Sequence, residues 1–342
     1  MNKANPIINI LKFAFASAIV VHHTEQYRSA CGIENFWQNP TIISLGKTSI
    51  VFFFVLSGFL VTNSIINNDF NIKEFYKKRF LRIAPLYYIL VLCSIFIFPN
   101  ILNISYQANV HQTILYLFFL PNIAIALSPD LLLAHTWFIG TSEQCHAIFA
   151  ALYQQLKNKT NIITLILSII LCYWILGLVL KIFFQNTFLY IFWHFFNIDC
   201  IAIGALFALF KENKISRFFS KRVFFYIAIF TSIFLLISGI IIPYFQNQIL
   251  AIVFGIIIYN ITKKRLTFIS DKKLVTFLGN ISYSIYLFHP IIIICLINSL
   301  GKFARNSIIT HSLILLLTFV IATIFYFFIE KRFLYKKRNP MN

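Results

Sequence analysis

Long apolar runs separated by short polar segments form the main pattern of this chain. Most runs hold about 20 residues, the length that an α-helix needs to cross the hydrocarbon core of a bilayer. They lack the strict alternation of apolar and polar positions that is typical of membrane β-barrel strands. The pattern therefore predicts an all-α, polytopic membrane helix bundle of about ten transmembrane helices. The ten runs lie near residues 7–26, 42–66, 83–103, 134–155, 162–182, 188–210, 222–242, 245–262, 275–299 and 307–329.

One further apolar segment, residues 112–127, does not fit this pattern. Its sequence, QTILYLFFLPNIAIAL, is short for a transmembrane helix and is interrupted by Pro121. A proline removes a helical hydrogen bond and kinks or ends a helix. We therefore expect an interfacial or re-entrant segment, and an eleventh transmembrane helix is the alternative.

The basic residues indicate the orientation of the bundle. They gather in short segments at 73–82, 157–159, 211–222, 263–273 and 331–338. If residues 112–127 do not cross the membrane, all five segments lie on the side of the N-terminus. An excess of Lys and Arg marks the cytoplasmic side, so both termini are expected in the cytoplasm. Of the basic segments, only 301–305 then lies outside.

Composition supports a membrane protein and restricts its partners. Apolar residues make up 59% of the 342 residues and charged residues 11%, against about 45–50% and 25% in soluble domains. The mean hydropathy is +0.81. The net charge of +19 does not indicate nucleic acid, because the basic residues occupy short loops between apolar runs. Such loops attract anionic membrane lipids or a phosphorylated substrate in the cytoplasm.

The lengths of the loops and the spacing of the cysteines argue against an attached soluble domain, a disulfide framework and a metal site. No loop is long enough for a soluble domain, so residues 1–342 are predicted to form one integral membrane domain with a short basic cytoplasmic tail at 331–342. The six cysteines show no CxxC spacing. Neither a disulfide framework nor a metal site is therefore expected.

Ionisable side chains inside the apolar runs are the candidates for chemistry. Each costs about 2.5–3.5 kcal/mol on insertion scales, so those that persist tend to face an interior cavity. They are Lys12, His22, His23, His135, Glu143, His146, His194, Asp199 and His289. Of these, His146 and His194 are expected to be packed or interfacial, without an assigned role.

Lys12 and His23 share one face of the first predicted helix. Eleven residues separate them, which is about three turns, or roughly 16 Å along the axis. The two side chains are therefore able to line one passage, with the lysine near the cytoplasmic end. The alternative is that Lys12 extends to the interface and that His22 and His23 only mark the end of the helix.

Three other intramembrane residues have distinct interpretations. Glu143 is either an acid, a base or the partner of a cation, or it is a neutral carboxyl held by hydrogen bonds. A structural or capping role explains Asp199 better than a chemical one. His289 precedes Pro290, and a proline leaves the backbone carbonyl four residues earlier without its helical donor, often beside a cavity.

A basic cluster lies where the third run meets the cytoplasm. Arg79 and Arg82 are three residues apart, on one face of a predicted helix, and Lys78 is adjacent. Such a cluster commonly sets topology and contacts lipid. Its other interpretation is the recognition of phosphate groups, since a guanidinium group forms paired hydrogen bonds with phosphate oxygens.

These candidates belong to a set of sequence blocks that occur together. After the lysine and histidine of the first run come FFFVLSGFL (52–60), FYKKRFLRIAPLYY (75–88), HTWFIGTSEQ (135–144), NIDCIAIGALFAL (197–209), LGNISYSIYLFHP (278–290) and FFIEKRF (327–333). In these blocks the chain resembles the acyltransferase-3 family of membrane O-acyltransferases. That family is typified by bacterial O-acetyltransferases of O-antigens and other surface glycans. The resemblance covers nearly the whole chain.

The resemblance implies a function and a set of site residues. An acyl group, most often acetyl, would move from cytoplasmic acyl-CoA to a hydroxyl of a glycan or lipid-linked saccharide, in the bacterial inner membrane. The implied residues are catalytic His23, Glu143 and Lys12, donor-binding Arg79, Arg82 and Lys78, and, lining the substrate site, Ser57, Ser282, Tyr283, Tyr286 and His289. Acetyl-CoA acts as a co-substrate, and no tightly bound cofactor is expected.

The chain departs from the family's pattern at several positions. Ser142 stands where many members have a glutamate, and Glu143 follows it. Cys145 and His146 occupy the positions of an aromatic pair that is usual there. Asn197 replaces an arginine that often precedes the aspartate of the next block.

The resemblance also suggests how the reaction proceeds. We expect the CoA nucleotide to stay at the cytoplasmic face while its pantetheine arm passes Lys12 and brings the thioester near His23. Neutral imidazole is suited to accept the proton of a sugar hydroxyl near neutral pH. Glu143 is expected to orient the ring or to help move the proton, and Tyr283 or Ser282 to stabilise the developing oxyanion. An acyl-histidine intermediate is an alternative course.

A transporter or flippase for a glycan or lipid-linked sugar is the alternative function, since it too places charges inside the membrane. The sequence shows no inverted repeat and no pair of broken helices, which are features of many transporters. A structural membrane scaffold explains the 41 Phe and 16 Tyr residues but gives His23 and Arg82 no role.

Overall fold

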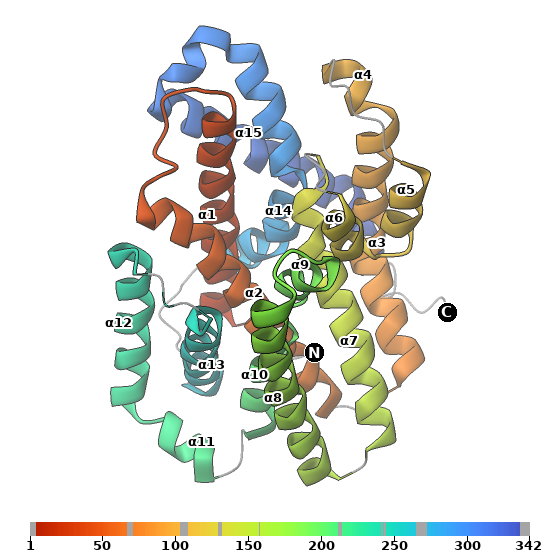
Figure 1. Cartoon of the computed structure of the whole chain (residues 1–342), viewed down its shortest axis with the longest axis vertical. Coiled ribbons are helices and arrows are strands. Elements are labelled where there is room, and N and C mark those ends of the chain that lie inside the picture. Colours follow the sequence, from red (N-terminus) through yellow and green to blue (C-terminus); the bar gives the residue numbers. More distant parts are fainter. Residues whose placement is uncertain are drawn as a thin grey trace. The chain divides into compact units, whose positions relative to one another are not determined.

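A computed structural model describes residues 5–66, 71–102, 109–128, 132–156, 158–210, 214–240, 242, 244–264 and 272–335. Within these ranges the chain is all-helical and has no strand (Figure 1), as the hydrophobic pattern predicts. The elements are α1 (Pro6–Ala30), α2 (Pro40–Ile66), α3 (Ile72–Phe96), α4 (Phe98–Leu102), α5 (Val110–Leu117), α6 (Pro121–Leu127), η1 (Ala134–Thr136), α7 (Trp137–Gln155), α8 (Lys159–Phe183), α9 (Phe188–Phe195), α10 (Ile198–Leu209), α11 (Lys214–Phe219), α12 (Arg222–Ser238), α13 (Gln246–Lys264), α14 (Lys272–Leu300), η3 (Gly301–Arg305), α15 (Ser307–Phe325), η4 (Tyr326–Glu330) and α16 (Lys331–Tyr335).

The chain divides into two compact units. The first unit comprises Met1–Ser49, Lys73–Asn109 and Leu266–Asn342. The second unit comprises Ile50–Ile72 and Val110–Arg265. Helix α2 begins in the first unit and ends in the second, and the two units are described separately below.

Within the described ranges, seven helices are long and apolar enough to cross a membrane. They are Pro6–Ala30, Pro40–Ile66, Ile72–Phe96, Lys159–Phe183, Phe188–Leu209, Lys273–Leu300 and Ser307–Phe333. Helices α7, α12 and α13 form at three further predicted runs but are not among the seven, and α12 has only 17 residues. Each of the ten runs thus contains helix, while the crossing of these three stays a prediction.

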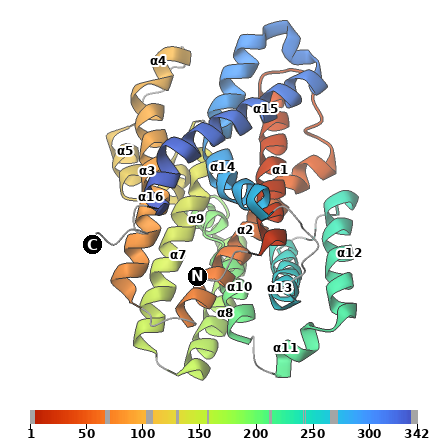
Figure 2. The same cartoon turned by 180° about the vertical axis from the view of Figure 1, so that it is seen from behind.

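The first unit is built around α1. This helix packs along α14, and α14 packs along α15, as both views show (Figures 1 and 2). Asn5 caps the start of α1 by accepting a hydrogen bond from the backbone N–H of Ile7. Pro6 follows at the first helical position, where the missing N–H of a proline costs no hydrogen bond within the helix. Gly279 of α14 leaves no room for a side chain beside Asn9. The two helices therefore approach closely at this point.

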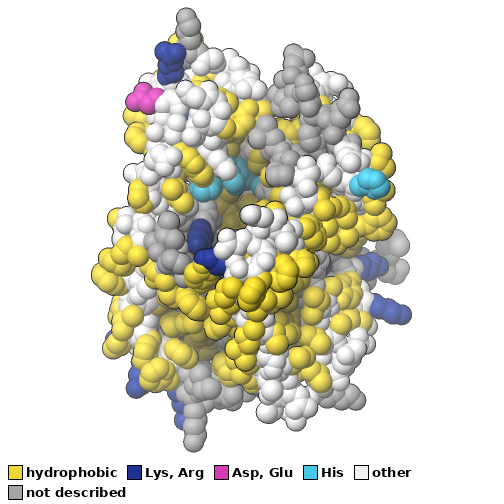
Figure 3. All heavy atoms as spheres, viewed as in Figure 1, with side chains coloured by type: hydrophobic (Ala, Val, Ile, Leu, Met, Phe, Trp, Pro, Cys, Tyr) yellow, Lys and Arg dark blue, Asp and Glu magenta, His cyan; other side chains and the backbone are white. Residues whose placement is uncertain are grey.

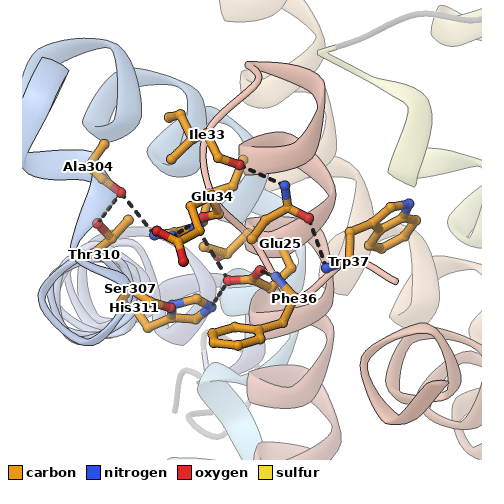
Figure 4. Close-up of polar contacts among 12 residues, drawn as sticks. Glu25, Ile33, Glu34, Phe36, Trp37, Ala304, Ser307, Thr310 and His311 are labelled. Atoms are coloured by element: carbon orange, nitrogen blue, oxygen red, sulfur yellow. Dashed lines mark hydrogen bonds and ion pairs between the residues drawn. The ribbon is translucent and has the colours of Figure 1, made fainter. Parts of the chain in front are cut away.

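The other end of α1 is fixed by buried charges (Figure 4). Arg28 donates a hydrogen bond to the backbone carbonyl of Ala304 at 2.9 Å. Glu25 accepts one from the backbone N–H of Phe36, and its carboxylate lies 3.1 Å from Nε2 of His311. These contacts hold the segment after α1 and the turn before α15 against the end of the helix.

Helix α3 corrects the expected position of the basic segment 73–82. The charge pattern predicted a loop there, while the spacing of the arginines predicted helix, and the segment lies inside the helix. Glu74 in the first turn pairs with Lys78 one turn later at 2.9 Å, and both the spacing and the acidic first turn favour helix. Arg79 and Arg82 do lie on one helix, as predicted. Of the other basic segments, Lys157 and residues 211–213, 265–271 and 336–342 lie outside the described ranges.

The second unit is built around α10. Every residue of this helix is buried, and α7, α8 and α13 pack against it. A methyl group at Gly58 of α2 would overlap the backbone carbonyl of Ile201, and one at Gly204 would overlap that of Val55. The backbones of α2 and α10 therefore meet without a side chain between them.

The predicted run 188–210 is one of the seven candidate spans, but its helix is interrupted between α9 and α10. Asn197 lies at the break with φ −9° and ψ 43°, outside helical geometry. Its amide donates to the carbonyl of His194 at 2.8 Å, and its oxygen accepts from Asn247 at 3.1 Å. The second of these contacts comes from α13, so a local hydrophobic pattern does not reveal it.

The ambiguous segment 112–127 forms two short helices, α5 and α6. Phe119 between them has a positive φ of 59°, and Pro121 begins α6. Helices of eight and seven residues are about 12 and 10 Å long, against a hydrocarbon core of about 30 Å. Neither helix is long enough to cross alone.

The exterior of the helices is strongly apolar. Hydrophobic side chains cover most of the face shown in Figure 3, and Lys, Arg, Asp and Glu side chains are sparse on it. Leu171, Phe230 and Leu316 are examples of large apolar side chains that are more than half exposed. Contiguous apolar surface of this kind is expected in lipid rather than in water.

Candidate active site

The geometry of His23 favours a role as a base. Its Nδ1 lies 2.8 Å from Oε1 of Gln26, one turn further along α1. An amide oxygen accepts hydrogen bonds, so Nδ1 carries the ring proton and donates it to Gln26. In the neutral ring, Nε2 then keeps its lone pair. This is the form in which imidazole accepts a proton from a substrate hydroxyl.

A proline fixes the same tautomer in His289. Pro290 lies inside α14 and has no N–H for the carbonyl of Tyr286, four residues earlier. Nδ1 of His289 donates to that carbonyl at 2.6 Å. The imidazole thus takes the place of the missing backbone donor. The sequence predicts the exposed carbonyl, and the structure shows that its own neighbouring histidine satisfies it.

Three imidazoles meet in the first unit. The rings of His23 and His289 stack with their centroids 5.2 Å apart, and His22 meets His23 edge-on at 5.0 Å. Nδ1 of His22 donates to the carbonyl of Ile42 at 2.8 Å, while Gly46 lies against the His22 ring. The pairing of His23 with His289 joins α1 to α14, and no sequence spacing predicted it.

Lys12, the other residue predicted to line the passage along α1, interacts with a charged residue of α3. Lys12 and His23 lie on one continuous helix, as their spacing requires. The charge of Lys12 is repelled by Arg82 of α3, and Arg82 is attracted by Glu330. Arg82 therefore acts electrostatically on both Lys12 and Glu330 within the first unit.

Glu330 is a site residue that the sequence analysis did not single out. It ends a turn of π-helix at Tyr326–Glu330, a kind of interruption that is frequent at functional sites. Its carboxylate accepts a hydrogen bond from the hydroxyl of Ser284 on α14. The block FFIEKRF, quoted for the family resemblance, was the available signal.

The remaining donor-binding candidates lie on the outer face of α3. Arg82 and Lys78 are exposed, and the ion pair between Lys78 and Glu74 is open to solvent. The guanidinium group of Arg79 lies over the Phe75 ring at 5.8 Å. Exposed pairs of this kind contribute little to stability, so these cations are able to exchange partners for a ligand.

The predicted substrate-lining residues of α14 make contacts to backbone carbonyls. The Ser282 hydroxyl donates to Gly279 at 2.8 Å, and the Tyr283 hydroxyl donates to Ile83 of α3 at 3.0 Å. Tyr286 is buried. In this state the Ser282 hydroxyl bonds within α14 and the Tyr283 hydroxyl joins α14 to α3, so the role of both in stabilising an oxyanion stays a prediction.

Ser57 and Glu143 lie in the second unit and share a partner. The Ser57 hydroxyl is 2.8 Å from Nε2 of His146. Nδ1 of the same ring is 3.7 Å from Oε1 of Glu143. His146 had been left without a role, and its contact with Ser57 links α7 to α2. The expected action of Glu143 on the His23 ring stays a prediction.

Asp199 has the surroundings of a structural residue. Its buried carboxylate accepts hydrogen bonds from Trp174 at 2.9 Å, from Gln248 at 2.6 Å and from the backbone N–H of Cys200 at 2.9 Å. The three donors belong to α8, α13 and the first turn of α10. The contacts agree with the structural or capping role that was predicted.

A comparison with known families identifies the chain. A family model described as an acyltransferase domain matches residues 5–329. The chain belongs to the acyltransferase-3 family of membrane acyltransferases. No curated protein and no solved structure matches it. Among the described residues of this acyltransferase, no group of three or more His, Cys, Asp or Glu side chains is placed to hold a metal ion.

We expect Pro290→Ala to lower the activity of this acyltransferase about tenfold, the effect of about 1.4 kcal/mol on the barrier. The new backbone N–H competes for the Tyr286 carbonyl, so His289 loses its fixed orientation against His23. The amount of folded protein, measured by size-exclusion chromatography in detergent, should not fall. Rates of acyl transfer in membranes of equal protein content provide the measurement.

The variant His289→Asn separates two explanations of this effect. Its side-chain amide keeps a donor near the position of Nδ1 but lacks the equivalent of Nε2. Normal activity in His289→Asn would limit the histidine to satisfying the carbonyl, whereas reduced activity would show that Nε2 is needed. Full activity in Pro290→Ala would contradict the proposed importance of the ring orientation.

Proposed function

We propose that this acyltransferase moves an acyl group, most simply acetyl, from cytoplasmic acyl-CoA to a hydroxyl of a cell-surface glycan or lipid-linked saccharide. It would act in the bacterial inner membrane with both termini in the cytoplasm. The observation that carries the proposal is the His23 imidazole, whose Nδ1 is held by Gln26. Membership of the acyltransferase family supports transfer of an acyl group. The acyl-CoA donor and the saccharide acceptor rest on the family resemblance and on the chemistry of the site residues.

His23 acts as the general base of the proposed reaction. A sugar hydroxyl is a weak nucleophile until its proton is removed. Nε2 accepts that proton as the oxygen attacks the thioester carbonyl, and the imidazolium then returns it to the leaving thiolate. Gln26 stabilises the charged ring through Nδ1, and the stacked His289 limits its rotation.

The cations of α1 and α3 bind the donor. CoA carries phosphate groups, which match guanidinium and ammonium groups in charge and geometry. Arg82 is an exposed residue in the interior of α3, and Glu330 acts on it electrostatically. Arg79 and Lys78 lie about one turn before Arg82 on the same helix. Lys12 lies about three turns before His23 along α1, which suits guidance of the thin pantetheine arm towards the base.

Labelled acetyl-CoA tests this function directly. Membranes from a strain that expresses the protein are incubated with the labelled donor, and the surface polysaccharide is analysed by mass and by its acetyl NMR signals. Label in the glycan, absent from a deletion strain, supports the proposal. Movement of unmodified glycan without consumption of acetyl-CoA would instead support a transporter.

We expect Arg82→Ala to raise KM for acetyl-CoA by about ten- to hundredfold with little change in kcat. A charge-assisted hydrogen bond contributes about 1.5–3 kcal/mol. A contact to the nucleotide, remote from the reacting carbonyl, acts equally on the bound and transition states. Initial rates at varied donor concentration measure both constants. Arg222→Ala, which removes an exposed arginine at the start of α12, is the matched control.

A truncated donor makes this prediction specific. Acetyl-pantetheine has the same thioester but no nucleotide, so Arg82→Ala should leave its KM unchanged. Equal loss with both donors would contradict phosphate binding by Arg82 and would indicate damage to the site as a whole.

A further inference from the structure

A serine, a histidine and a glutamate of the second unit are arranged as a nucleophile, a base and a carboxylate that orients the base. We propose that Ser57, His146 and Glu143 form a nucleophilic centre in which Ser57 carries the acyl group as an ester during transfer. The proposal rests on the proposed function, since the donor is an acyl thioester. It keeps the overall transfer but replaces the direct attack on the thioester by a covalent step, in which His146 removes the protons that the direct course gives to His23, and it assigns Glu143 to His146.

One of the two distances meets the requirement of such a centre directly, and the other is longer than a hydrogen bond. Nε2 of His146 lies 2.8 Å from the Ser57 hydroxyl, which is the reach needed between a nucleophile and its base. Nδ1 of the same ring faces Oε1 of Glu143 at 3.7 Å. Catalytic contacts of this kind are often long before substrate binds. The imidazole thus lies between the hydroxyl and the carboxylate, as in serine hydrolases on unrelated folds.

The carboxylate determines which ring nitrogen acts as the base. A negative charge beside Nδ1 favours the proton on that nitrogen, which leaves the lone pair on Nε2. Ser57 then donates to Nε2 and is ready to lose its proton. His146 is 1% exposed and Glu143 21% exposed. The ring is therefore shielded from water, while the carboxylate keeps some solvation.

The orientation of Ser57 differs from that of a serine with a purely local role. Serines inside helices commonly donate to the carbonyl of the preceding turn, and Ser49 of the same helix does so, to Leu45 at 2.6 Å. Ser57 is directed at His146 and remains half-buried. The adjacent Gly58 is in close backbone contact with α10, so the helix that presents the hydroxyl is held firmly.

The proposed chemistry proceeds in two balanced steps. In the first, His146 Nε2 takes the Ser57 proton, a bond forms between Ser57 Oγ and the acyl carbon, and the bond between that carbon and the thiol sulfur breaks. The imidazolium gives its proton to the leaving thiolate. In the second step a hydroxyl of the acceptor loses its proton to Nε2 and attacks the ester. The bond to Ser57 breaks, and the serine regains a proton from the imidazolium.

Acyl retention on the purified full-length protein tests the proposal. The protein in detergent is incubated with labelled acetyl-CoA and no acceptor, then denatured, digested and mapped by mass spectrometry. We expect label on the peptide that contains Ser57, stable at neutral pH and released by alkaline hydroxylamine. Ser57→Ala should abolish it, and His146→Phe, which restores an aromatic residue, should lower its rate at least a hundredfold. Ser232→Ala, on α12, is the matched control and should retain full labelling.

The positioning role of Glu143 needs a separate readout. Glu143→Gln should lower the rate of labelling at Ser57, and Glu143→Asp should restore part of it. A carboxyl that only packs in the helix would be replaced equally well by the amide, so equal rates for Glu143→Gln and the unchanged protein would remove this residue from the centre. Monodisperse elution in size-exclusion chromatography shows that each variant is folded.

Two further outcomes distinguish this proposal from the proposed function. Transfer to acceptor at the normal rate in Ser57→Ala, or label lost at neutral pH and mapped to a histidine, would overturn the serine intermediate while leaving acyl transfer intact. If acetyl-CoA proves not to be the donor, a fluorophosphonate probe still reports on the nucleophile. Reaction at Ser57 that requires His146 supports the centre, and its absence from the folded protein overturns it.

Discussion

Replacement of His23 by Asn should abolish acyl transfer, with a loss of about 100- to 10,000-fold, the range attributed to general bases. The asparagine amide reproduces the donor at Nδ1, so the contact with Gln26 is kept. It offers no equivalent of Nε2, so in direct transfer the acceptor hydroxyl keeps its proton as it approaches the thioester. The loss should appear in kcat at saturating acetyl-CoA, because the base acts only in the chemical step.

The measurement is the rate of label transfer in membranes adjusted to equal protein content. His194→Asn is the matched control, since His194 is an exposed imidazole on α9 whose ring contacts the carbonyl of Tyr190. It should retain full activity. A His23→Asn protein that is folded and active would rule out this ring as the base. Activity in His23→Gln, which places an amide near Nε2, would limit the role to hydrogen bonding.

Substitution of Gly58 by alanine should unfold or strongly destabilise the second unit. The added methyl group overlaps the backbone carbonyl of Ile201 on α10, and neither backbone is able to move as a side chain would. Overpacking of a core costs about 1–3 kcal/mol and more where backbones must shift. We expect a fall in the thermal midpoint of roughly 5–10 °C, since each kcal/mol moves it by about 2–4 °C in a domain of this size.

Gly32→Ala separates this effect from ordinary backbone strain. Gly32 has a φ of +66° and no atom within 4 Å of the position where a methyl would lie. An alanine there pays only the left-handed penalty of about 1–2 kcal/mol. Thermal unfolding followed by fluorescence-detected size exclusion compares the two variants. Equal stability of Gly58→Ala and Gly32→Ala would contradict the close contact between α2 and α10.

The positions of the helices were largely predictable from the sequence, because length and apolar content determine where a helix forms in a membrane. The errors occurred where contacts distant in sequence decide the outcome. The break at Asn197 depends on Asn247, fifty residues later. The loop predicted at 73–82 was a different kind of error, because the contact that favours helix there, the ion pair between Glu74 and Lys78, is local. The spacing of Arg79 and Arg82 had already predicted helix within this segment.

The same distinction applies to the candidate site. Helical spacing placed Lys12 and His23 on one helix face, and Pro290 indicated an unpaired carbonyl in α14. Spacing has no means of showing that His289 stacks on His23, because 266 residues separate them. The contact of His146 with Ser57 spans 89 residues. His146 had been given no role, and Ser57 had been expected only to line the substrate site.

The surroundings of Asp199 have a consequence for biosynthesis. Its segment leaves the ribosome well before Gln248, which supplies one of its three hydrogen-bond donors. A carboxylate within a membrane span is disfavoured by up to about 2.5–3.5 kcal/mol during insertion. Until α13 has been synthesised, Asp199 therefore lacks the hydrogen bond from Gln248 that offsets part of this cost. We therefore expect the nascent chain to keep α10 at the translocon, or among earlier helices, until the later segment arrives.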